Sequence, residues 1–152
     1  MAAAKHFDVI VIGSGAAGMM CAATAGQRGR KVLIIDHAEK LAEKIRISGG
    51  GRCNFTNLEV GIANYLSRNP QFCRSALSRF TPAHFIERVN RHGIRWHERE
   101  HGQLFCDDSA QDIIDMLRTG CDSGQVSWAM PCQLETIGAG TEPGARFILD
   151  TS

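Results

Sequence analysis

Three glycines spaced Gly-x-Gly-x-x-Gly follow directly on an apolar run, Val9–Ile12, and this spacing is typical of a loop that holds phosphate groups. Gly13 allows the tight turn, Gly15 lets the backbone approach a pyrophosphate, and Gly18 lets the following helix pack against the strand. The N–H groups at the start of that helix then face the phosphate oxygens. The candidate phosphate-binding residues are Gly13, Ser14, Gly15, Ala16, Ala17 and Gly18.

Residues 31–36 are expected to form a second parallel strand, which is apolar at 32–35 and ends in a carboxylate placed to bind the sugar of the same ligand. Asp36 comes 23 residues after Gly13, a spacing that suits two parallel strands linked by a helix, with the acidic residue bonding ribose hydroxyls. Together the turn and the carboxylate predict a dinucleotide site. The alternative is an ordinary strand–helix–strand unit whose glycines only shape a turn.

A glycine-rich stretch at 44–57 reads Lys-Ile-Arg-Ile-Ser-Gly-Gly-Gly-Arg-Cys-Asn-Phe-Thr-Asn. It predicts irregular backbone, because neither a helix nor a strand favours three consecutive glycines. Its N–H groups can form a nest against a flat or anionic group, with Lys44 and Arg52 supplying positive charge. The alternative is a flexible surface loop.

These motifs together resemble one family. A glycine turn followed by Lys-x-x-x-Ser-Gly-Gly-Gly-Arg-Cys-Asn-x-Thr-Asn is similar to the BaiN/RdsA (YhiN-type) NAD(P)/FAD-dependent oxidoreductases, also called the aminoacetone-oxidase family of FAD-binding enzymes. The similarity covers essentially the whole chain. Further similar segments are Phe-Thr-Pro at 80–82, His-Gly-Ile at 92–94, and residues 102–113.

The resemblance implies FAD as the cofactor, NAD(P)H as a possible electron donor, and a small organic substrate such as a compound with a carbon–carbon double bond. It implies that the glycine turn binds the FAD pyrophosphate and that Asp36 binds the adenosine ribose. In related FAD folds the adenine meets backbone at the start of a hairpin, here Leu134. The resemblance also places along the pyrophosphate, ribityl chain and flavin ring the residues Lys44, Ser48, Gly49, Gly50, Gly51, Arg52, Cys53 and Asn54.

Members of that family are much longer than this chain of 152 residues. The resemblance therefore implies that 1–152 is the N-terminal portion of an FAD-binding domain, without the inserted substrate domain and the C-terminal segment that completes the fold. Such a portion alone is expected to be inactive. The alternative is a non-catalytic nucleotide-binding remnant of such an enzyme.

The remaining pattern predicts the rest of an α/β fold. Val126–Met130 is expected to be a third parallel strand, which gives the order 3-2-1 and half of a doubly wound sheet. Leu134–Ile137 and Arg146–Asp150 flank a glycine-rich turn and predict a C-terminal β-hairpin. The expected fold class is therefore a Rossmann-like FAD/NAD(P)-binding fold.

The middle of the chain predicts helical scaffold. Asn69-Pro70 is expected to begin a helix that turns Phe72 and Phe80 inward. Thr81-Pro82 is expected to begin a second helix that stops at His92-Gly93. Ser109 predicts the start of a third helix, which ends near the glycines at 120 and 124 and whose inward residues are Ile113, Ile114 and Leu117.

No residue here predicts acid–base catalysis, and Cys53, the nearest candidate, is expected to pack rather than react. His97-Glu-x-x-His101 matches a zinc motif that works only on a helix, whereas 94–97 alternates like a strand, so a polar hairpin and no metal are expected. The six cysteines include no Cys-x-x-Cys pair, which also argues against a zinc site.

Charge is uneven along the chain, although the formal net charge is only +1. Residues 44–99 carry ten basic and three acidic side chains, whereas 100–152 carry two and nine. We interpret the arginines as a solvated helical face rather than a nucleic-acid patch, so no nucleic-acid partner is expected. Apolar runs are too short to span a membrane, and the N-terminus lacks a signal-peptide core, so no membrane partner and a cytoplasmic location are expected.

Overall fold

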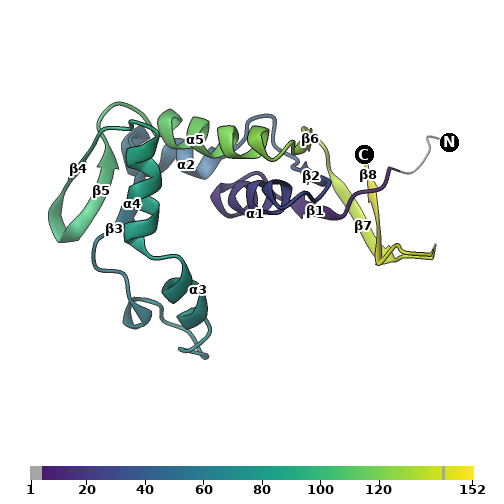
Figure 1. Cartoon of the computed structure of the whole chain (residues 1–152), viewed down its shortest axis with the longest axis horizontal. Coiled ribbons are helices and arrows are strands. Elements are labelled where there is room, and N and C mark those ends of the chain that lie inside the picture. Colours follow the sequence, from purple (N-terminus) through teal and green to yellow (C-terminus); the bar gives the residue numbers. More distant parts are fainter. Residues whose placement is uncertain (1–4, 142) are drawn as a thin grey trace. The chain divides into compact units, whose positions relative to one another are not determined.

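The computed structural model describes residues 5–141 and 143–152, and the chain divides into two compact units (Figure 1). The first unit comprises the chain up to Lys44 together with Leu117–Ser152, and the second comprises Ile45–Met116. The boundary at 116–117 falls inside a helix, α5 (Ala110–Ser123). Each unit has its own sheet, and we describe each by itself.

The first unit contains the parallel sheet that the sequence predicts. Its strands are β1 (Val9–Ile12), β2 (Val32–Ile35) and β6 (Ser127–Ala129), in the order β1-β2-β6, so the expected order 3-2-1 is confirmed. Uniformly apolar β1 and β2 pair in parallel register. β2 is largely buried, whereas β1 is half-buried and ends at the exposed Ile12. The hairpin is confirmed as β7 (Leu134–Ala139) and β8 (Phe147–Thr151). The fold is therefore Rossmann-like α/β.

Helix α1 (Ala16–Gln27) connects β1 to β2 and begins two residues before Gly18. Its contact with the turn that follows α5 depends on glycines, because a Cβ at Gly26 would lie 2.2 Å from the carbonyl oxygen of Gly124. The Cys121 thiol also donates to the carbonyl of Met19 at 3.4 Å. Because both helices pack this closely, α1 is held rigidly behind the glycine turn.

The second unit is built on an antiparallel sheet that the sequence did not predict in full. Its order is β3-β5-β4, and α4 packs against β3, with the rings of Phe55 and Phe85 6.0 Å apart. Leu104 on β5 and Val89 on α4 are fully buried. The elements are α2 (Glu43–Ile47), η1 (Ser48–Gly51), β3 (Asn54–Asn57), η2 (Ile62–Asn64), α3 (Arg74–Arg79), α4 (Pro82–Arg91), β4 (Trp96–Glu98), η3 (Glu100–Gly102) and β5 (Gln103–Cys106).

Two predictions in this unit are wrong. The glycine-rich stretch 44–57 is not irregular throughout, because it contains most of α2, all of η1 and the strand β3. β3 pairs with β5 across a bulge between Asn54 and Thr56. The helix after Asn69 is only α3, and Phe72 before it is 83% exposed instead of inward. The Thr81 cap of α4 is confirmed, since its hydroxyl accepts from the N–H of His84 at 3.4 Å.

Histidines of the zinc motif lie on non-helical backbone. His97 is on β4, and His101 is in η3 with φ +60°. The expected strand and hairpin are therefore confirmed, and the i, i+4 geometry that the motif requires is not formed. No helix in 5–141 or 143–152 is long and apolar enough to cross a membrane.

Gly18 provides a test of how the turn and helix fit together. A Cβ there would lie 2.0 Å from the carbonyl oxygen of Gly13, a contact with rigid backbone that cannot be relieved without moving α1. We expect Gly18→Ala to lower the free energy of unfolding by about 2–4 kcal/mol. Urea denaturation followed by circular dichroism measures this change.

Gly15→Ala is the matched control, because an added Cβ at Gly15 meets nothing within 4 Å and the residue has φ −76°. It should change the free energy of unfolding by less than about 0.5 kcal/mol. Equal stability of the two variants would contradict the steric explanation for Gly18.

Candidate functional site

The glycine turn has the geometry that its sequence predicts. Gly13 has φ +102°, a conformation that favours glycine, and its N–H donates to the carbonyl of Ile35 on the neighbouring strand at 2.8 Å. Gly15 is the N-cap residue of α1, with open space where its side chain would be. The turn therefore presents bare backbone at the N-terminus of a 12-residue helix.

The N-terminus of α1 is electrostatically suited to an anion. No side chain in the described part of the chain caps it by a hydrogen bond, and its first turn contains no acidic residue. The first N–H groups of a helix have no partner within the helix and carry the positive end of its dipole. The N–H groups after Gly15 are therefore suited to phosphate oxygens.

Asp36 is the centre of the hydrogen-bond network at this site. Its Oδ2 accepts from the Ser14 N–H at 2.6 Å and from the Ser14 Oγ at 2.7 Å. Its Oδ1 accepts from the Ala38 N–H at 2.8 Å. Only 13% of the Asp36 side chain is exposed, and Ser14 is buried. The carboxylate thus ties the end of β2 to the turn after β1.

These bonds also set the ionisation of Asp36. Burial alone would raise the pKa of the Asp36 carboxyl, but the N–H groups of Ala38 and Ser14 and the Ser14 hydroxyl outweigh it. With a further contribution from His37, the pKa is lowered below its ordinary value of 3.8. The carboxylate is therefore ionised at neutral pH and keeps acceptor capacity beyond its three bonds.

The start of the hairpin lies beside Asp36. The Asp36 N–H donates to the carbonyl of Ala129 at 3.2 Å, and its carbonyl accepts from the Cys132 N–H at 2.8 Å. Leu134, the first residue of β7, is half-buried two residues beyond Cys132. The main-chain bond from Cys132 was not predicted, since nothing in the residue types indicates it.

The triple glycine adopts left-handed backbone throughout. Gly49, Gly50 and Gly51 have φ of +58°, +66° and +85°. A Cβ at Gly49 would lie 2.7 Å from the Phe105 ring, whereas Gly50 and Gly51 face open space. Glycine is thus required at Gly49 both for conformation and for close packing on β5.

Cys53 is a packing residue. It is 4% exposed, and burial raises the pKa of its thiol, an effect that a hydrogen bond with Ser48 reduces. Burial likewise raises the pKa of the nearby Cys106 thiol to about 12. Both thiols are therefore protonated at neutral pH and poor nucleophiles. Their neighbours Arg52 and Asn54 are exposed.

A histidine–carboxylate pair in the second unit was also not predicted. His97 Nδ1 lies 2.7 Å from the Asp107 Oδ1, and Arg99 Nε lies 3.2 Å from His97 Nε2. The local sequence does not indicate this pair, because His97 and Asp107 are ten positions apart and come together only when β4 pairs with β5. We assign no catalytic role to this pair.

The predicted site residues fall into two groups. The first unit brings the glycine turn, Asp36 and Leu134 together and also contains the exposed Lys44. The second unit contains Ser48–Gly51 with Arg52, Cys53 and Asn54. The binding roles of these residues stay predictions.

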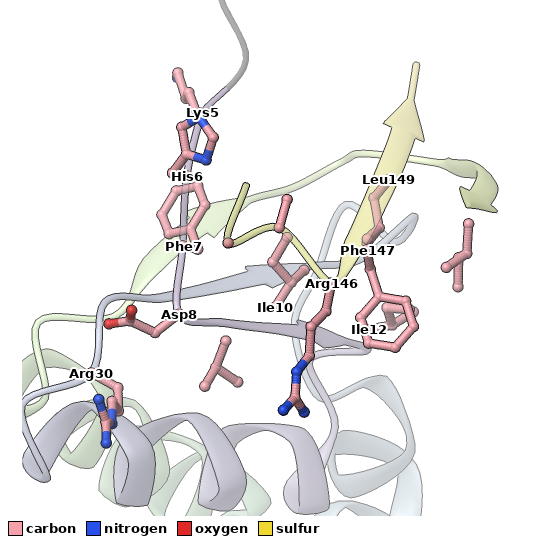
Figure 2. Close-up of a pocket in the computed structure, with 14 residues that line it drawn as sticks. Lys5, His6, Phe7, Asp8, Ile10, Ile12, Arg30, Arg146, Phe147 and Leu149 are labelled. Atoms are coloured by element: carbon pink, nitrogen blue, oxygen red, sulfur yellow. The ribbon is translucent and has the colours of Figure 1, made fainter. Parts of the chain in front are cut away.

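A hollow in the first unit borders the outer edge of β1 (Figure 2). Among the described strands, β1 pairs with β2 alone, and Ile12 at its end is 55% exposed. Phe147 of β8, which is 66% exposed, lines the same hollow as Ile12 (Figure 2). A uniformly apolar strand such as β1 is usually covered, so an unpaired edge beside exposed apolar side chains is unusual for it.

Comparison with known proteins gives a family match over nearly the whole chain. The family model described as HI0933-like protein Rossmann domain matches residues 7–151. The ribosomal RNA dihydrouridine synthase of Escherichia coli K12 is 56% identical over 146 residues, which cover 96% of this chain and 36% of the relative. The protein of the same name from Haemophilus influenzae is 51% identical over 118 residues, covering 78% and 29%. The chain thus spans about a third of these relatives.

Among solved structures, glycine oxidase from Geobacillus kaustophilus superposes with a TM-score of 0.57 at 15% identity. The match covers 96% of this chain and 51% of the oxidase. At this identity the likeness concerns the fold alone.

The expectation of no nucleic-acid partner is wrong. Two relatives that share more than half of their aligned residues with this chain are named for ribosomal RNA. The number of charged residues does not distinguish arginines that face only solvent from arginines that contact phosphates.

Asp36→Asn tests the electrostatic role of the carboxylate. Because the folded pKa is lowered, ionised Asp36 stabilises the fold above its unfolded pKa, and this contribution is lost as the pH falls through the folded value. We expect Asp36→Asn to be less stable by about 1–3 kcal/mol at pH 7, with a smaller difference at pH 3. Denaturant titrations across this range measure both differences.

Asp122→Asn, which removes an exposed carboxylate on α5, is the matched control and should have little effect at either pH. A difference between Asp36→Asn and the wild-type protein that did not change with pH would contradict the proposed linkage.

Proposed function

We propose that this chain, which belongs to the HI0933-like family of Rossmann domains, is the nucleotide-binding part of an FAD-dependent oxidoreductase. The observation that carries the proposal is the ionised Asp36 bonded to Ser14 beside the uncapped N-terminus of α1. This arrangement places N–H donors for a pyrophosphate beside a carboxylate that can accept from ribose hydroxyls. Bound FAD supplies the redox chemistry.

The residues of the first unit have separate tasks in this proposal. The open face of Gly15 leaves room for a phosphate close to the backbone, and the N–H groups that follow donate to it. Asp36 holds the adenosine ribose with the acceptor capacity that Ser14 and Ala38 leave. Backbone at Leu134 meets the adenine, since the Cys132 bond keeps the start of β7 beside Asp36.

The residues of the triple-glycine stretch are proposed to contact the rest of the cofactor. Gly50 and Gly51 have positive φ and nothing within 4 Å of an added Cβ, which suits backbone that lies against a flat ring or a phosphate. Lys44 and Arg52 are exposed and supply positive charge for anionic groups. Cys53, which is buried, holds this stretch by donating its N–H to the carbonyl of Ser48 at 3.1 Å.

The substrate that the relatives' names support is a uridine in ribosomal RNA. Dihydrouridine differs from uridine by two hydrogens across one carbon–carbon double bond, so its formation consumes two electrons and two protons. A nicotinamide dinucleotide, NAD(P)H, is the proposed donor of a hydride, and the second proton comes from solvent or an acidic group. The chemistry agrees with the double-bond reduction that the family resemblance implies.

We also propose that 1–152 is the N-terminal portion of the FAD-binding domain. The open edge of β1 and the exposed Ile12 and Phe147 beside it support this view, because a further strand there would cover both side chains. In this proposal the inserted substrate domain and the returning segment belong to a longer protein.

Gly15→Ala in the full-length protein tests FAD binding. An added methyl group would occupy the space proposed for phosphate while leaving the fold intact. We expect FAD affinity to fall about 10–100-fold, the scale of one or two lost charge-assisted hydrogen bonds. Flavin fluorescence titration of the apoprotein measures the affinity, and unchanged binding would place the pyrophosphate elsewhere.

The activity is tested with the full-length protein, NADPH or NADH, and uridine-containing ribosomal RNA. We expect the purified protein to be yellow and to add two hydrogens to a uridine, detected by mass spectrometry of nucleosides after digestion. RNA incubated with the protein but without a nicotinamide donor is the control. A flavin-loaded protein that oxidises NAD(P)H without changing the RNA would favour a small-molecule substrate instead.

A further inference from the structure

The segment from Val60 to Ile86 contains no aspartate or glutamate. It contains three arginines, Arg68, Arg74 and Arg79, so a long continuous part of the second unit carries only positive charge. Such a stretch has the electrostatic character of a polyanion-binding element.

The structure distinguishes these arginines from others in the same unit. Arg91 pairs with Glu87, and Arg95 pairs with Asp108 at 3.0 Å. By contrast, the three arginines of the acid-free segment are exposed and make no ion pair with any residue in 5–141 or 143–152. Their guanidinium groups are therefore available to an external partner.

Exposed aromatic residues lie among and beside these arginines in the sequence. Phe72 is 83% exposed, Tyr65 is 48% exposed and Phe80 is 42% exposed, all within residues 65–80. In α3 the half-buried residues are Cys73 and Leu77, just before and within the helix, while both helical arginines face solvent. Figure 1 shows α3 and the loop before it extending beyond the end of α4, away from the β3-β5-β4 sheet.

We propose that this arginine–aromatic segment, residues 65–80, is a docking surface for unpaired RNA. The arginines contact phosphates, and the exposed rings stack on bases that are splayed out of a loop or bulge. The inference rests on the proposed function, since it names where the RNA substrate is held. RNA suits the segment better than a protein partner, because exposed guanidinium groups without a single carboxylate among them complement a polyanion.

The test compares two double variants in the full-length, flavin-loaded protein. Arg74→Gln with Arg79→Gln removes two charges from the segment, and Arg28→Gln with Arg118→Gln removes two exposed charges from the first unit. Fluorescence anisotropy with a labelled single-stranded oligouridine measures affinity at several salt concentrations. We expect the segment variant to bind about tenfold or more weakly, with a salt slope shallower by about 1.4. The other variant should stay within about twofold of wild type.

Phe72 separates base stacking from simple apolar contact. Phe72→Leu keeps an apolar side chain but removes the ring, and we expect at least about fivefold weaker RNA binding. Phe72→Tyr keeps the ring and should bind like the wild type. FAD content and thermal stability of each variant are measured in parallel, because neither should change.

The outcomes distinguish this inference from the proposed function. If wild-type protein binds FAD and RNA but the segment variants bind RNA equally well, the docking surface is elsewhere and the proposed function stands. Equal loss in both arginine double variants would show that only net charge matters and would overturn the inference. If the wild-type protein binds FAD but no RNA, the RNA substrate and this inference both fail.

Discussion

The bond between the Asp36 carboxylate and Ser14 is the interaction on which the site depends. A single oxygen accepts from both the N–H and the hydroxyl of Ser14, so one side chain fixes the turn after β1 from the end of β2. The second oxygen, bonded to the Ala38 N–H, fixes the chain that leaves β2. Because the carboxylate is almost fully covered, these bonds are poorly screened by water and hold the turn in one conformation.

The position of α1 is limited sterically at two glycines near its two ends. Gly18 brings the helix against the carbonyl of Gly13, and Gly26 brings its other end against Gly124, the residue that follows α5. At both points backbone meets backbone, where adjustment is costly. The helix N-terminus therefore stays directed at the space beside Gly15. Gly18 and Gly26 are needed because any side chain at these positions would collide with backbone.

The sequence was sufficient where local pattern and tertiary structure agree. Apolar runs, the glycine spacing and the Thr81 cap correctly predicted β1, β2, α1 and α4, together with the strand order. It failed where structure depends on distant partners: Asn54–Asn57 forms a strand because β5 pairs with it. Phe72 has helical spacing but no neighbour to pack on, so an apolar pattern alone overestimated burial.

For the site, the sequence identified the residues but not their mutual bonds. The spacing of Asp36 from the glycine turn placed both at one site but did not predict the bonds between Asp36 and Ser14, which form because β1 and β2 are parallel and in register. The same holds for the main-chain bond from Cys132 to Asp36, which any residue other than proline can make at that position.

The uncapped start of α1 makes the stability of the first unit a function of ligand supply. Natural helices commonly satisfy their first N–H groups with a serine, threonine or aspartate at the N-cap, where α1 instead has Gly15. An anion that binds only the folded form adds free energy that grows with the logarithm of its concentration, about 2.7 kcal/mol at a hundredfold excess over its dissociation constant. In the proposed function this anion is FAD, so we expect the protein to spend more time unfolded and to be degraded faster when flavin is scarce.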